Sequence, residues 1–68
     1  MILAELQHGA LQQISQPCEL HSSEGECLQL VPKTWIYVAS VNKKLGFALL
    51  IINQKAQYFP LIQEIYVQ

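Results

Sequence analysis

Arginine and aspartate are both missing from this 68-residue sequence, and its charged side chains are four lysines and five glutamates. Phosphate contacts need clustered cations, so this scarcity disfavours nucleic acid as the main ligand. It also excludes intrinsic disorder, which combines low hydrophobicity with high charge. Apolar residues make up 51% of the chain and the mean hydropathy is +0.22. We interpret the excess of apolar side chains as contact surface for another protein chain.

Long hydrophobic runs are also missing. The longest strongly apolar stretch, Phe47–Ile52, is far shorter than the roughly 20 residues of a transmembrane helix, so we expect no membrane span. The start, Met1–Glu5, has no basic residue and reaches a charge at its end, which is not typical of a signal peptide. We therefore expect a cytoplasmic protein with reduced cysteines, folded as one small domain over residues 1–68.

The first sixteen residues favour a helix. Met1–Gln16 is rich in leucine, alanine, glutamine and glutamate, and Ile2, Leu6 and Ala10 fall on one helical arc. Pro17 would end such a helix. The alternative is a pair of strands that turns at His8 and Gly9.

The rest of the chain favours strands. A polar stretch, Pro17–Glu26, is typical of a loop, and four apolar segments rich in β-branched and aromatic residues follow it. These predicted strands are Cys27–Val31, Thr34–Val41, Phe47–Ile52 and Tyr58–Val67. The sequence therefore predicts an α+β fold, with a short N-terminal helix on a small, curved antiparallel sheet of about four strands. An all-β small barrel is the alternative.

Two predicted strands, Thr34–Val41 and Phe47–Ile52, are apolar on nearly all positions, which is typical of strands covered on both faces. One short helix covers a single face, so the other must be covered by barrel closure or by another subunit. We predict a non-enzymatic interaction protein, either a homo-oligomer or a small subunit of a larger assembly. The expected interface residues are Trp35, Ile36, Tyr37, Val38, Phe47, Leu49, Leu50, Ile51, Ile52 and Tyr66.

Two cysteines and two histidines provide an alternative hypothesis, a zinc-stabilised binding module. Cys18 and His21 have the tight spacing of a zinc knuckle, Cys27 follows six residues later, and His8 can complete a set of four N and S ligands. The same four residues are equally consistent with two free thiols and two loop histidines that bind no metal. We therefore expect no cofactor.

Catalysis and nucleic-acid binding have less support. Either cysteine can pair with a histidine as a nucleophilic dyad, with Glu19, Glu24 or Glu26 to orient the base, but these residues lie in a predicted loop without a cleft. We therefore expect no enzymatic activity. A small oligomeric nucleic-acid binder is the least favoured alternative. In it, the symmetry of the oligomer would repeat Lys43 and Lys44 in every subunit and so gather enough positive charge to bind phosphates.

Overall fold

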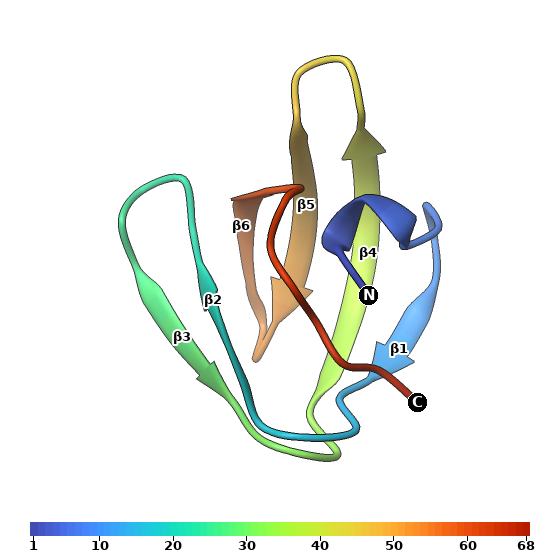
Figure 1. Ribbon diagram of the computed structural model, residues 1–68, viewed down its shortest axis with the longest axis vertical. Helices are drawn as coiled ribbons and strands as arrows, with labels where there is room; N and C mark the ends of the chain where they lie inside the picture. Colours follow the sequence, from blue (N-terminus) through green and yellow to red (C-terminus); the bar gives the residue numbers. More distant parts are fainter.

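The computed structural model describes residues 1–68 as a mostly β fold made of two antiparallel sheets (Figure 1). A four-stranded sheet has the order β1-β4-β5-β6, and β2 and β3 form a separate hairpin. The strands are β1 (Leu11–Gln13), β2 (Cys18–His21), β3 (Cys27–Leu30), β4 (Trp35–Asn42), β5 (Phe47–Ile52) and β6 (Lys55–Pro60). The lone helical element, η1 (Leu3–Glu5), is a single 3-10 turn, so no helix of the protein is long enough to cross a membrane.

The predicted N-terminal helix is wrong. After η1 the chain turns at Gly9, whose φ of 82° lies in the left-handed region and whose N–H donates to the carbonyl of Val38 at 2.7 Å. Residues 11–13 then pair with β4 as strand β1. The alternative hairpin within residues 1–16 is wrong too, because Ile2 bridges to Glu64 near the other end of the chain. Tertiary pairing has overridden the helix propensity of this segment.

The predicted strands match the structure best in the middle of the chain. β3 falls within its predicted segment, β5 has the predicted bounds, and β4 matches its segment except that it extends one residue further, to Asn42. The last strand differs, because β6 starts at Lys55, directly after a tight turn. Asn53 and Gln54 both have positive φ there, 52° and 69°, the backbone of a two-residue type I′ hairpin. The stretch from Leu61 onward is irregular and adds only isolated bridges, such as the one between Ile14 and Val67.

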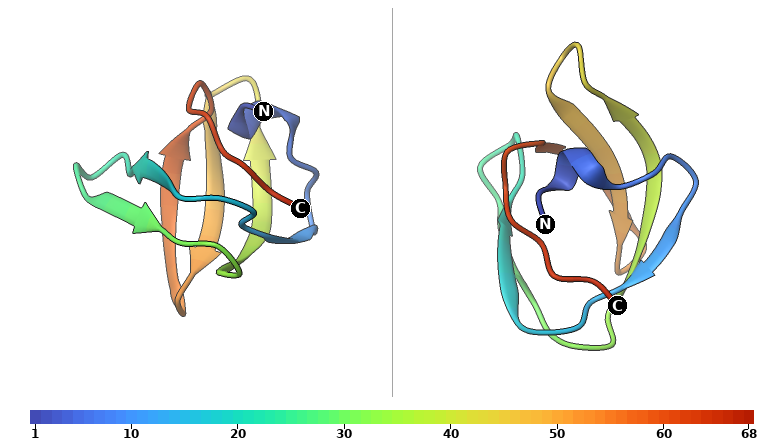
Figure 2. Two further views of the ribbon diagram at one scale, coloured as in Figure 1. Left: turned by 60° about the horizontal axis from the view of Figure 1, so that its bottom comes forward. Right: turned by 45° about the vertical axis from the view of Figure 1, so that its right-hand side comes forward.

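The β2–β3 hairpin lies across the core from β4, and η1 and the C-terminal segment fill the space between them (Figure 2). The N–H of Ser23 donates to the carbonyl of Tyr58 at 2.8 Å, which ties the hairpin to β6. The pairing nevertheless stops short of a closed barrel, so the alternative prediction was right about the strands and wrong about the closure.

Only one face of the four-stranded sheet is covered by the chain itself. Its inward side chains join residues from η1, the hairpin and the C-terminal segment in a core of thirteen buried apolar residues. A bulge between Val38 and Ser40 keeps the apolar side chains of β4 on the inner face of the sheet. It turns Ser40 outward, so that Val41 pairs with Ala48 on the inner face. The core consists of Leu3, Leu6, Ile14, Leu20, Leu30, Ile36, Val38, Ala48, Leu50, Ile52, Phe59, Leu61 and Ile65.

Candidate functional site

The outer face of the four-stranded sheet carries a continuous apolar patch. The strand register places Leu11, Tyr37 and Ile51 side by side across β1, β4 and β5. Leu49 lies beside Tyr58 of β6 in the same way. Five large side chains on this face are exposed by 37 to 60%, namely Leu11, Trp35, Tyr37, Phe47 and Tyr58. We call these five residues, with the half-buried Leu49 and Ile51, the outer patch.

Two shallow hollows shape the outer patch, one at each end of the strands. The first lies beside the β4–β5 hairpin, where Phe47 and Tyr58 form its apolar wall. The second lies near the β5–β6 turn and is lined by Trp35, Tyr37 and Ile51 among others. The patch therefore offers two places where a protruding side chain of a binding partner can be received.

The structure divides the ten predicted interface residues into two faces. Five of them belong to the outer patch, whereas four are inward and at most 2% exposed: Ile36, Val38, Leu50 and Ile52. These four are core residues of a single chain and present no surface to a partner. Tyr66 is exposed, but it lies in the C-terminal segment and outside the sheet. The sequence-based set missed Leu11, which lay in the predicted helix, and Tyr58, which alternates in β6 with the buried Gln57 and Phe59. Because Gln57 is polar, no alternation of polar and apolar residues in the sequence marks Tyr58 as outward.

Charge is unevenly distributed along the chain. Residues 27–63 contain all four lysines and no glutamate, whereas the remaining residues contain all five glutamates. Lys55 pairs with Glu26 of the hairpin at 2.9 Å. The other three, Lys33, Lys43 and Lys44, lie in the turns that flank β4 and form no salt bridge. The outer patch is therefore apolar at its centre and basic at both ends of its strands.

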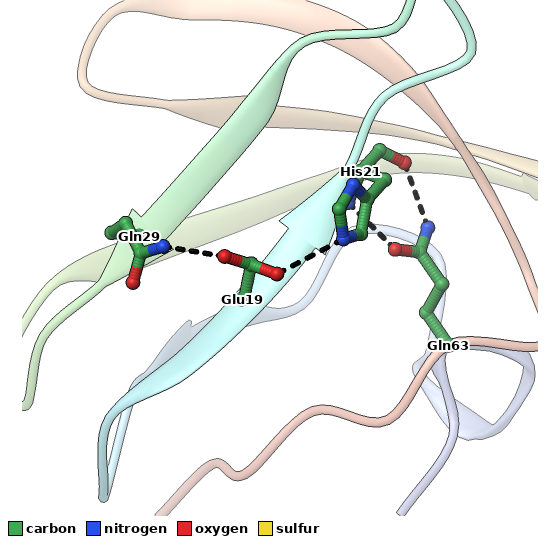
Figure 3. Close-up of polar contacts among 4 residues, drawn as sticks. All are labelled: Glu19, His21, Gln29 and Gln63. Carbon is green, nitrogen blue, oxygen red and sulfur yellow. Dashed lines mark hydrogen bonds and ion pairs between the residues drawn. The ribbon is translucent and has the colours of Figure 1, made fainter.

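A second polar feature lies on the exposed side of the β2–β3 hairpin. Glu19, His21 and Cys27 place a carboxylate oxygen, an imidazole nitrogen and a sulfur within 4.8 Å of one another. His21 Nε2 lies 3.1 Å from one carboxylate oxygen of Glu19, and the other oxygen accepts a hydrogen bond from Gln29 Nε2 (Figure 3). We call the three ligand-bearing residues the hairpin cluster.

Strand alternation decides which residues belong to the hairpin cluster. His21 is paired directly with Cys27, so both side chains emerge on one side of the hairpin, together with Glu19 two residues earlier. Cys18 is paired with Leu30, whose side chain is buried, and points to the opposite side. His8 lies in the turn before β1 and is outside the cluster. Both cysteines are free. Two of the four predicted metal ligands therefore come together, and Glu19 joins them in place of Cys18 and His8.

The carboxylate of Glu19 and the thiol of Cys27 shift each other's pKa in opposite directions. A hydrogen bond from the Cys27 thiol to the carboxylate lowers the pKa of Glu19 and raises the pKa of Cys27. A cysteine nucleophile is activated by the opposite change, a lowered pKa next to cationic groups. In the metal-free cluster Cys27 is therefore a thiol that donates to Glu19, and not an activated thiolate.

Gln63 fixes the backbone beneath the hairpin cluster. Its amide oxygen accepts a hydrogen bond from the His21 N–H at 2.6 Å, and its amide nitrogen donates to the His21 carbonyl at 2.9 Å (Figure 3). The same nitrogen donates to the carbonyl of Pro60 at 3.1 Å. The end of β2 is thereby attached to the C-terminal segment by a side chain that no sequence pattern singled out.

No protein-family model matches the chain, and it is matched by no curated protein and by no solved structure.

Proposed function

We propose that the protein is a non-enzymatic interaction module that works as a dimer of this chain, joined through the outer patch. The observation that carries the proposal is the contrast between the two faces of one sheet. The inner face is covered by η1, the hairpin and the C-terminal segment, whereas the outer face leaves five large apolar side chains exposed. Contiguous apolar surface of this kind marks contact sites on soluble proteins.

The size of the outer patch fits a second copy. A large aromatic side chain has a surface of about 150–250 Å². Because the five large side chains of the patch are exposed by 37 to 60%, their exposed surface adds up to roughly 500 Å². The accessible surface of the whole chain is 4295 Å², so the patch is a sizeable part of it. Pairing two copies buries roughly 1,000 Å², which reaches the lower limit for a specific interface. A second copy is therefore a sufficient occupant without any further partner.

The charge distribution is compatible with this pairing. The net charge of −1 causes little overall repulsion between two copies. The three unpaired lysines lie at the ends of the strands, so they remain in water when the apolar centres of two patches meet. Platforms that stack nucleic-acid bases combine aromatic rings with a cationic groove, whereas the aromatic rings of this patch are interspersed with the aliphatic side chains of Leu11, Leu49 and Ile51. Protein is therefore favoured over nucleic acid as the occupant.

Sedimentation velocity at micromolar concentration tests the proposal. The wild type should sediment as a species of twice the 7.7 kDa chain mass. Tyr37→Lys, which places a charge in the centre of the patch, should sediment as a folded monomer. The matched control is Ile62→Lys, at an apolar residue that is 85% exposed outside the sheet, and it should remain dimeric. A well-folded wild-type monomer, or a control that dissociates as readily as Tyr37→Lys, would overturn the proposal.

A further inference from the structure

The geometry points to a second site on this protein, at which Glu19, His21 and Cys27 bind a divalent transition-metal ion of the zinc class. The site lies on the exposed side of the β2–β3 hairpin and shares no residue with the outer patch. It is independent of the proposed dimer.

The spacing of the three ligand atoms fits a tetrahedral ion. Zinc binds nitrogen, oxygen and sulfur at about 2.0–2.3 Å, which places tetrahedral ligands roughly 3.3–3.8 Å apart. In the hairpin cluster all three atoms lie within 4.8 Å of one another, and the nitrogen of His21 is 3.1 Å from Glu19. The three ligand atoms are therefore close enough for rotations of their side chains to bring them to one ion.

The chemistry of the three ligands selects the class of ion. A thiolate and an imidazole favour zinc, copper or cobalt over magnesium and calcium, which prefer oxygen ligands. On binding, the ion displaces the thiol proton of Cys27, and the resulting thiolate and the Glu19 carboxylate together balance a charge of +2. Three protein ligands leave the fourth position open for water, as in zinc sites that are not purely structural.

The backbone that carries the ligands is held in place before any ion binds. The direct pairing of His21 with Cys27 fixes both side chains on one side of the hairpin. Gln63 holds the backbone of His21 through two hydrogen bonds, and Gln29 donates to the Glu19 oxygen that His21 does not contact. Of these partners, Gln29 contacts a ligand side chain directly, and the loss of such a contact typically weakens metal binding by about 10–100-fold.

Titration with Co²⁺, under metal-free conditions and with a reductant that is not a thiol, tests the site directly. Wild-type protein should bind one Co²⁺ per chain, with a thiolate-to-metal charge-transfer band that one equivalent of Zn²⁺ removes. Cys27→Ser should lose the band, and Glu19→Gln and His21→Ala should each weaken binding by at least about tenfold. All three residues are exposed, so circular dichroism should show that the variants remain folded.

The chain provides its own matched controls, a second cysteine and a second histidine outside the cluster. Cys18→Ser and His8→Ala should bind Co²⁺ as tightly as the wild type. The inference fails if wild-type protein shows no thiolate band, or if its dissociation constant is weaker than about 1 mM. It also fails if Cys18→Ser loses as much affinity as Cys27→Ser, because the ligands would then lie elsewhere.

Discussion

Two neighbouring leucines of β5 test which face of the four-stranded sheet is the core. Leu50 is fully buried between Val38 of β4 and Gln57 of β6, whereas Leu49 points outward and is half-buried. Truncating a buried leucine to alanine costs about 2–5 kcal/mol, because apolar contacts are lost and a cavity is left. We expect Leu50→Ala to lower the free energy of unfolding by about 3 kcal/mol. Leu49→Ala removes the same atoms from a half-exposed position and should cost about 1 kcal/mol.

Urea denaturation monitored by tryptophan fluorescence measures both changes, at protein concentrations low enough to keep the chain monomeric. A domain of this size has a total stability of roughly 3–10 kcal/mol, so Leu50→Ala removes a large part of it. If that variant does not fold, Ile36→Val at another fully buried position should cost about 0.5–1.5 kcal/mol. Equal costs for Leu49→Ala and Leu50→Ala in the monomer would refute the assignment of the two faces.

Three further predictions concern charge and backbone. Hydrogen bonds from Lys55 and then Gln57 lower the pKa of Glu26, so this carboxylate stabilises the fold above its unfolded pKa, and the gain is lost as the pH falls through the lower folded pKa. The melting temperatures of wild type and Glu26→Gln should therefore differ at neutral pH and converge as the pH falls below the lowered folded pKa; a constant difference would contradict the pairing. Gly46 has a φ of 83° with open space around it, so Gly46→Ala should cost about 1–2 kcal/mol in urea denaturation through backbone strain alone, and Gly46→Asn should recover much of it. Added salt should tighten the wild-type dimer in sedimentation equilibrium, because it screens the lysines of two facing sheets; a steep loss of affinity with salt would instead indicate that opposite charges hold the two copies together.

The central hairpin of the sheet could be predicted from sequence because its local and tertiary preferences agree. Thr34–Val41 and Phe47–Ile52 are rich in β-branched and aromatic residues, and the structure uses both as strands. In the first sixteen residues the two preferences conflict. Leucine and glutamine favour a helix, but the backbone N–H of Leu3 donates to the carbonyl of Gln63, a residue at the other end of the chain. Such a contact between distant residues leaves no local pattern in the sequence.

The hairpin cluster shows how one wrong assignment of secondary structure changes a predicted site. With Pro17–Glu26 taken as a loop, Cys18 and His21 have the spacing of a zinc knuckle and can turn toward one ion. In a strand, however, side chains alternate between the two sides, so residues three apart point in opposite directions. The structure makes this segment strand β2, with the buried Leu20 as its anchor in the core. That alternation removes Cys18 from the ligand set and brings in Glu19. The ligand residue types thus indicated residues 18–27 as a candidate metal site, but only the strand register determines which of these side chains meet.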